Sequence, residues 1–324
     1  MWSSEGRKLM GCACLPHYLE KQDLSALDDA LAGVRLSQYC TTDGRQLELY
    51  WLGAQASPKL VLLPPYGMSY LLLSRLAQRL ARHFHVLCWE SIGCPNSQTS
   101  VTAEDFDLDR QAATLLGILH QHDYADCHFV GWCQAAQLAV HAIALHGFAP
   151  RSMAWVAPAG LLPPIVKSEF ERCALPIYLQ IERHGLEQAK KLAAILDKYR
   201  GQPLRGDDLA EKLTMLHLAD PASTLVFSRY MRAYEENKQS VQALLPTALG
   251  RHPTLIVHCK DDSFSHYSAS VQLARHDPSL RLDLLDHGGH LQLFNDPGAV
   301  AQRIIDFIGL TVGEVAPTSM HSAA

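Results

Sequence analysis

One cysteine in this sequence stands where a reactive side chain would be presented. The peptide GWCQA at 131–135 lies between a short apolar run and a segment with helical periodicity, 134–146. A tight strand-to-helix turn needs small residues two positions before and after its centre, because neighbouring backbone approaches closely. Gly131 and Ala135 meet that need. Cys133, at the start of a helix, is a candidate nucleophile, although five residues alone are more typical of a buried structural cysteine.

A carboxylate and an imidazole that could activate Cys133 follow it in the sequence. The apolar run 254–258 is followed by Asp261 and Asp262, and the next apolar run by a loop that ends in His290. A thiol becomes a nucleophile when an imidazole takes its proton and a carboxylate holds the imidazole in the correct tautomer. We therefore expect Cys133, His290 and one of the two aspartates to act together.

Attack on a carbonyl also needs N–H donors for the developing oxyanion. The residue after the nucleophile, Gln134, would supply one backbone N–H, and the loop after the apolar run 59–63 would supply the other. That loop begins with two prolines, which have no N–H to donate. Tyr66 is the expected second donor, and Gly67 is the alternative if the loop is shifted by one residue.

The elements that must position these residues are strands alternating with helices. Runs 34–40 and 46–52 flank the turn signal TDGR at 42–45 and predict an antiparallel hairpin. Further strands are expected at 59–64, 85–89, 127–131, 153–157, 254–258 and 282–285, with helices at 108–122 and 134–146 and one begun by Asn295-Asp296-Pro297. Such alternation predicts the α/β class, a mostly parallel sheet with helices on both faces.

Residues 161–250 break the alternation, because they contain helical segments such as 186–199 and 208–218 and no convincing strand. We expect them to form a helical cap over the carboxyl edge of the sheet, where open α/β sheets bind ligands. The predicted division is an irregular segment 1–25, a core of 26–160 and 251–312, the cap 161–250, and a flexible tail 313–324.

Composition excludes several classes of protein. The 324 residues are 48 % hydrophobic and 19 % charged, which permits a packed core and excludes global disorder. A net charge of −5 without a long basic block argues against nucleic acid or an anionic membrane as the main partner. No apolar run is long enough for a membrane span or a secretory signal. Nine scattered cysteines suit a reducing cytosol, so a cytoplasmic location is expected.

No metal site is expected from the sequence. Two close histidine pairs, His83/His85 and His120/His122, stand at the ends of predicted elements, where surface histidine is the usual explanation. The basic residues of the predicted cap are open to two interpretations, an acidic partner or a solvated helix face; they are Lys190, Lys191, Lys198 and Arg200.

Taken together, these residues resemble the α/β-hydrolase superfamily over about 34–310. The elbow motif G-x-S-x-G of that fold corresponds to GWCQA, with Cys133 in place of serine and Ala135 in place of the second glycine. The order nucleophile, acid, histidine is also the order of that fold. Its usual G-x-x-D spacing, with Cys259 in place of the glycine, favours Asp262 over its neighbour as the acid.

The segment 90–97 resembles another loop of the same superfamily, D-x-x-G-x-G-x-S after the fourth strand, with Glu90 for Asp and Pro95 for the second Gly. The resemblance implies an α/β-hydrolase fold, with a mostly parallel sheet, an N-terminal antiparallel hairpin and a helical cap inserted before the penultimate strand. It implies Cys133, His290 and Asp262 as the catalytic residues.

A cysteine at the elbow favours acyl transfer. Its acyl-enzyme is a thioester, so exchange with a thioester donor is nearly isoenergetic, provided that the cap excludes water. The chain is similar to the aminoacyl shuttles of nonribosomal peptide pathways, which carry an aminoacyl group between the phosphopantetheine thiols of two carrier proteins. This resemblance implies acyl or peptidyl carrier proteins as partners, no bound cofactor, and a substrate presented on a phosphopantetheine arm.

Two other functions stay open. The same three residues would serve a thioesterase or a small-molecule ester or lactone hydrolase. A non-catalytic protein of this fold would bind a ligand under its cap, but a binder has no need of Cys133, Asp262 and His290 in order. Transfer of an acyl group through a Cys133 thioester is the function we expect.

Overall fold

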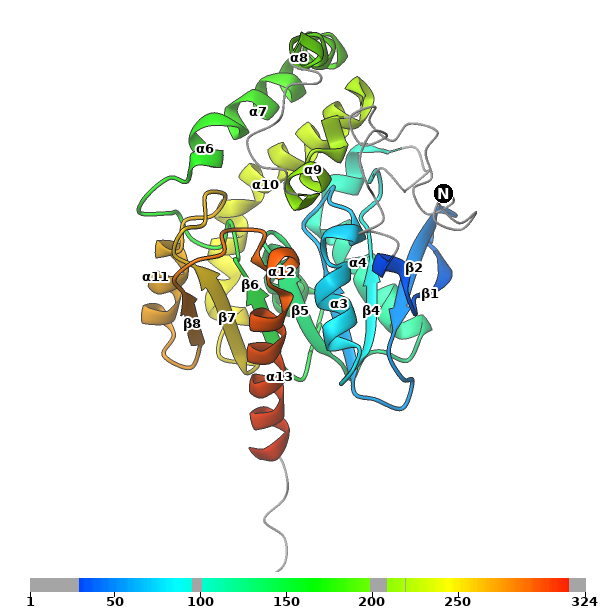
Figure 1. Cartoon of the computed structure of the whole chain (residues 1–324), viewed down its shortest axis with the longest axis vertical. Helices are drawn as coiled ribbons and strands as arrows, with labels where there is room; N and C mark the ends of the chain where they lie inside the picture. Colours follow the sequence, from blue (N-terminus) through cyan, green and yellow to red (C-terminus); the bar gives the residue numbers. More distant parts are fainter. Residues whose placement is uncertain (1–28, 95–100, 199–208, 219, 315–324) are drawn as a thin grey trace, which may run out of the picture.

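The fold is built on one eight-stranded sheet, seen in a computed structural model that describes residues 29–94, 101–198, 209–218 and 220–314 (Figure 1). The strands are β1 (Arg35–Cys40), β2 (Gln46–Leu52), β3 (Lys59–Leu63), β4 (His85–Trp89), β5 (His128–Trp132), β6 (Met153–Val156), β7 (Thr254–Cys259) and β8 (Arg281–Leu285). Their spatial order is β1-β2-β4-β3-β5-β6-β7-β8. The predicted hairpin is confirmed, since β1 and β2 pair antiparallel, and β2 pairs antiparallel with β4. All pairs from β4 to β8 are parallel.

Side chains of the parallel strands alternate between two cores. In β3, Leu60 and Leu62 belong to the core on one face, whereas Val61 and Leu63 belong to the core on the other. Because both faces of β3 are covered, this strand is apolar from Leu60 to Leu63 instead of alternating with polar residues.

Helices cover both faces of the sheet (Figure 1). One face carries α3 (Ser74–Leu80), α12 (Gln292–Asn295) and α13 (Pro297–Glu314), and the other carries α4 (Leu108–Gln121), α5 (Ala135–Leu145) and part of α10 (Pro221–Ala248). A further helix, α11 (Ser268–His276), lies beside β8. The predicted central helix is confirmed, because α5 is enclosed by β5, α4 and α10, which explains its apolar residues all round.

All described elements between β6 and β7 are helical. They are α6 (Glu169–Cys173), α7 (Leu175–His184), α8 (Leu186–Lys198), α9 (Leu209–Thr214), a short 3₁₀ turn and α10. Asp220 begins α10 by accepting from the backbone N–H of Ala222 and Ser223, at 2.8 and 3.0 Å. One part of α10 contacts α7 and another packs on α5, so a single helix joins the cap to the core.

The predicted N-terminal segment 1–25 and most of the predicted tail lie outside the described residues. Within the part of the chain that the structure describes, no helix has both the length and the apolar character to cross a membrane.

Candidate active site

Cys133 occupies a sharp turn between β5 and α5. Its φ of 55° lies in the left-handed region, which costs a non-glycine residue about 1–3 kcal/mol. Its N–H donates to the carbonyl of Val156 at 2.9 Å, and its carbonyl accepts from the N–H of Ala159 at 3.2 Å. These two hydrogen bonds, to the end of β6 and the loop after it, hold the turn in place. A Cβ on Gly131 would lie 3.1 Å from the Cβ of Ala135, which explains the requirement for small residues. The turn therefore presents the thiol at the start of a helix.

The structure brings Cys133, His290 and Asp262 together. Nδ1 of His290 lies 2.8 Å from Oδ2 of Asp262, and the imidazole also hydrogen-bonds with the Cys133 thiol. Oδ1 of Asp262 accepts from the backbone N–H of Phe264 and Ser265, each at 2.8 Å. Since a carboxylate only accepts, Nδ1 of His290 carries a proton and leaves Nε2 for the thiol. His290 and Asp262 are only 6 % and 5 % exposed.

Electrostatic interactions among Cys133, His290 and Asp262 set the pKa values of the imidazole and the carboxyl group. Burial acts to lower the pKa of His290, but the Asp262 carboxylate and the Cys133 side chain outweigh it and raise that pKa to about 10. Burial acts to raise the pKa of Asp262, but the charge of His290 and hydrogen bonds from His258 and His290 hold it well below its usual range. The aspartate is thus ionised at neutral pH, and the imidazole readily holds a second proton.

Asp261, the alternative acid, has a different partner. Its carboxylate accepts from the backbone N–H of Gly288 at 3.2 Å and of Gly289 at 2.9 Å. It therefore braces the loop that precedes His290, while Asp262 holds the imidazole itself. His287, on the same loop, is exposed, and its Nδ1 lies 3.8 Å from Asp261.

A second buried histidine contacts the acid, and the sequence analysis missed it. His258 in β7 places Nε2 at 2.8 Å from the carbonyl of Ser265 and 3.3 Å from Oδ2 of Asp262. Because a carbonyl only accepts, Nε2 carries the proton, and Nδ1 accepts from the Ser270 hydroxyl at 2.8 Å. The signal in the sequence is a histidine inside an apolar strand, four residues before the acid.

Two aromatic rings flank the imidazole. The ring centroids of Phe264 and Trp132 lie 5.0 and 5.2 Å from that of His290, and the Phe264 ring is stacked on it. Such contacts fix the ring plane and favour a cationic imidazole over a neutral one.

The predicted oxyanion donors lie at the same cleft. Tyr66 and Gln134 line it together with Cys133 and His290. Within the described residues, the backbone N–H groups of Tyr66 and Gln134 donate to no protein acceptor. The N–H of Gly67, the alternative donor, is engaged with the Ser91 hydroxyl at 2.9 Å. The geometry therefore favours Tyr66 over its neighbour.

Glu90 shapes the loop that carries Tyr66. Its buried carboxylate accepts from the Ser69 hydroxyl at 2.9 Å and from the Tyr70 N–H at 2.6 Å, just after the turn. Glu90 therefore braces the loop that carries Tyr66. The end of the predicted motif, 95–97, lies outside the described residues.

The cleft above the thiol is mostly apolar, and its space measures about 540 Å³ when the open solvent at its mouth is included. Its side chains come from the core loops and from the cap; they are Pro65, Tyr66, Met68, Trp132, Cys133, Gln134, Ala159, Phe170, Thr214, Phe227, Met231, Tyr234, Phe264 and His290. His290 is the one ionisable nitrogen base among these lining residues, and no carboxylate is among them. The cap residues in this set were not predicted, because helical periodicity does not show where a helix packs.

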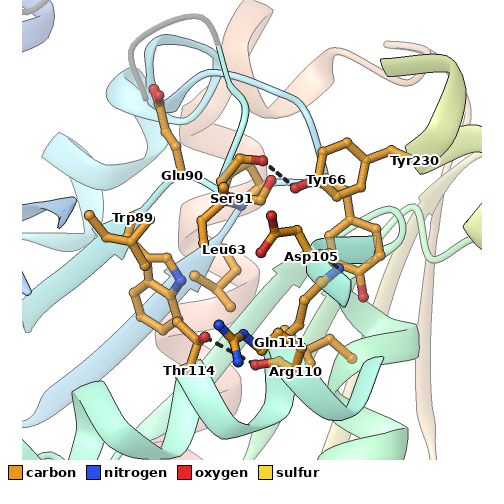
Figure 2. A pocket seen from close by; sticks show the side chains of 14 residues that line it. Leu63, Tyr66, Trp89, Glu90, Ser91, Asp105, Arg110, Gln111, Thr114 and Tyr230 are labelled. Carbon is orange, nitrogen blue, oxygen red and sulfur yellow. Dashed lines mark hydrogen bonds between the residues drawn. The ribbon is translucent and has the colours of Figure 1, made fainter. Parts of the chain in front are cut away.

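A second pocket, whose side chains Figure 2 shows, also has Tyr66 in its lining and measures about 500 Å³ when the open solvent at its mouth is included. Tyr66 and Tyr230 line it with stacked rings whose centroids are 5.7 Å apart. Asp105, at its wall, is buried and accepts from Nη1 of Arg45 at 2.5 Å. Tyr66 is therefore a lining residue of both pockets.

Comparison with known proteins identifies the family. The model of the "Alpha/beta hydrolase family" matches residues 60–303. A "Putative carbamate hydrolase RutD" of Pseudomonas syringae pv. syringae (strain B728a) is 27 % identical over 250 residues, 74 % of this chain and 90 % of that protein. A protein of the same name from Stutzerimonas stutzeri (strain A1501) is 23 % identical, over 80 % of this chain and 95 % of that protein.

Solved structures share the fold at low identity. Haloalkane dehalogenase DbeA from Bradyrhizobium elkani USDA94 superposes with a TM-score of 0.69 at 16 % identity, over 87 % of this chain and 99 % of that one. The structure of 1H-3-hydroxy-4-oxoquinoline 2,4-dioxygenase gives a TM-score of 0.65 at 18 % identity, over 84 % and 99 %. These names cover different reactions, so the likeness concerns the fold alone. The family match, however, takes in β3 through the first part of α13, and the chain belongs to the alpha/beta hydrolase family.

Proposed function

We propose that this hydrolase-fold enzyme cleaves thioesters or esters of uncharged, largely apolar acyl groups through a thioester on Cys133. The observation that carries the proposal is the thiol at the elbow in hydrogen-bonding contact with His290, whose Nδ1 is held by Asp262 at 2.8 Å. A structural cysteine has no need of a buried imidazole and carboxylate, and a strained turn is typical of a functional residue.

The first step forms the acyl-enzyme. The thiol of Cys133 first gives its proton to Nε2 of His290, and Sγ then attacks the substrate carbonyl carbon as a thiolate beside the imidazolium. The oxyanion accepts from the backbone N–H of Tyr66 and Gln134. When the carbonyl re-forms, the bond from carbon to the leaving sulfur or oxygen breaks, and the imidazolium gives its proton to that atom.

The second step releases the acyl group. Water or another thiol attacks the thioester carbon while His290 takes the incoming proton, and the bond to Sγ breaks. The Cys133 sulfur leaves and regains the proton from the imidazolium. The two steps together exchange one carbonyl substituent for another and restore the enzyme.

The lining of the cleft supports an uncharged acyl group. Phe170, Phe227 and Tyr234 project from the cap, and no carboxylate lies among the residues that line the cleft. An ammonium group there would lose its hydration without a counter-ion, which is costly, whereas apolar surface is favoured by about 25 cal/mol per Å² buried. A carbamate, the substrate class in the relatives' names, offers the same carbonyl.

Acyl transfer to a second thiol is the other candidate, and the cysteine itself favours it. A thioester on Cys133 keeps nearly all of the free energy of a thioester substrate, so a thiol acceptor can take the acyl group reversibly. The aminoacyl transfer between carrier proteins that the sequence resemblance implies stays a prediction, and the uncharged lining favours other acyl groups.

The experiment uses pantetheine thioesters that differ in charge. Phenylacetyl-pantetheine is uncharged, and phenylalanyl-pantetheine has a similar size but carries an ammonium group. Turnover is measured with and without a second thiol, cysteamine, with Cys133→Ala as the control.

Preferred loss of the phenylacetyl group to water supports a thioesterase, and its appearance on cysteamine supports transfer. A preference for the phenylalanyl substrate would contradict the proposed substrate class. Equal turnover by Cys133→Ala would contradict the nucleophile.

A further inference from the structure

Two histidines and an aspartate converge on one point at the junction of α4 and α5. Asp109 lies in the first turn of α4, His141 lies inside α5, and His146 follows its last turn. Oδ1 of Asp109 is 2.8 Å from Nε2 of His141 and 2.8 Å from Nε2 of His146. All three atoms lie within 4.8 Å of one another. His141 and His146 follow Asp109 by 32 and 37 positions, a spacing that matches no short metal-binding motif, so no metal site was expected from the sequence.

The spacing of these atoms suits one metal ion. Zn²⁺ binds imidazole nitrogen and carboxylate oxygen at about 2.0–2.2 Å, so neighbouring ligands of a tetrahedral ion lie about 3.4 Å apart. The observed 2.8 Å contacts need to open by only about 0.6 Å, which side-chain torsions of Asp109 and His146 can supply. Two imidazoles with one carboxylate are ligands that zinc, cobalt, nickel and copper prefer over magnesium or calcium.

We propose that Asp109, His141 and His146 bind a divalent transition-metal ion, Zn²⁺ being the representative case, with water completing its coordination. Their exposure suits both binding and access, since the His141 side chain is 10 % exposed and anchors the site, while that of Asp109 is 74 % exposed and open to solvent. Nδ1 of His141 is buried with no hydrogen-bond partner among the described residues, so Nε2, which faces Asp109, is the nitrogen that an ion would contact.

The ion would tie the start of α4 to the end of α5. His141 lies eight residues beyond Cys133 along α5, a distance of about 12 Å at the helical rise, so a bound ion does not touch the reacting thiol. Its effect is to stabilise the helix that carries the elbow. The inference is independent of the proposed function and is tested separately.

The test titrates the EDTA-treated full chain with Co²⁺ and follows its visible d–d absorption, with Zn²⁺ as the displacing ion. Each protein carries Cys133→Ser, so that the elbow thiol does not compete, and thiolate charge-transfer bands report any other cysteine site. The variants are His146→Gln and Asp109→Asn. The matched control is His120→Gln, which removes an exposed imidazole from α4.

We expect His146→Gln and Asp109→Asn to weaken binding by about tenfold or more and His120→Gln to leave it unchanged. Zn²⁺ at a hundredfold excess over its Kd should raise Tm by about 5 °C in the parent and not in His146→Gln. Equal isotherms for the parent, His146→Gln and Asp109→Asn would overturn the proposal. So would an unchanged Tm with Zn²⁺ in the parent, because the three residues would then form a hydrogen-bonded link only.

Discussion

Replacing Asp262 by asparagine tests what the carboxylate does for His290, because the two side chains have the same shape. In Asp262→Asn the amide oxygen can keep the two backbone N–H bonds at 2.8 Å, and the NH₂ then faces Nδ1 of His290. An NH₂ group donates, so Nδ1 must become an acceptor and its proton moves to Nε2. That nitrogen faces Cys133 and can no longer take the thiol proton.

The size of the effect follows from the electrostatics of the pair. The pKa of His290 is raised to about 10 from an ordinary 6.5, and each unit corresponds to about a tenfold change in equilibrium. Cys133 contributes part of that shift, so the carboxylate accounts for only some of it. A mispositioned tautomer costs serine triads about 10⁴-fold. We expect acylation to slow by about 10²- to 10⁴-fold.

The assay is the single-turnover acylation rate with phenylacetyl-pantetheine, followed by the released thiol. Asp261→Asn is the matched control, because it changes the neighbouring carboxylate, which braces the loop through Gly288 and Gly289. We expect this control to lose less than about tenfold. Near-normal acylation by a folded Asp262→Asn, or an equal loss in both variants, would refute the assignment of the acid.

Three further outcomes are expected. Gly131→Ala should lower the free energy of unfolding in urea by about 1–3 kcal/mol, because the added Cβ is crowded at the elbow. The control Gly309→Ala, at a helix position with open space around it, should not lower it, and equal effects would contradict the close approach at Gly131. The raised pKa of His290 stabilises the fold fully below about pH 6.5, and this stabilisation is lost as the pH rises through about 10. The free energy of unfolding should therefore fall between pH 7 and 10, and it should fall less in Asp262→Asn. An identical pH profile in the two proteins would contradict this. Phe170→Ala should raise KM for phenylacetyl-pantetheine about five- to twentyfold and change kcat little, and an unchanged KM would remove Phe170 from the acyl site.

Much of the scaffold follows from local patterns. The turn at Cys133 could be predicted because a tight strand-to-helix turn requires small residues two positions before and after its centre, and Gly131 and Ala135 stand there. The order of Asp262 and His290 after two later strands follows from the chain order of the family. The hairpin, the parallel strands and α5 were predictable because the pattern of apolar residues along each segment indicates its type and which of its side chains are buried.

The remaining features depend on contacts between distant segments. Asp261 and Asp262 differ by one position, and only the folded loops decide which one faces the imidazole. His258 was hidden because a histidine in a buried strand has no sequence mark of its partner. The aromatic side chains of Phe170 and Tyr234 reach the cleft from the cap, whose packing on the core no local pattern determines.

A covalent acyl group on Cys133 is the most direct sign of the proposed chemistry. Intact-mass spectrometry after brief mixing with phenylacetyl-pantetheine, followed by peptide mapping, should show one phenylacetyl group on the wild type. The peptide that contains Cys133 should carry it, Cys133→Ala should carry none, and added cysteamine or water should remove it. An adduct on another residue, or full turnover by Cys133→Ala, would contradict a thioester on this cysteine.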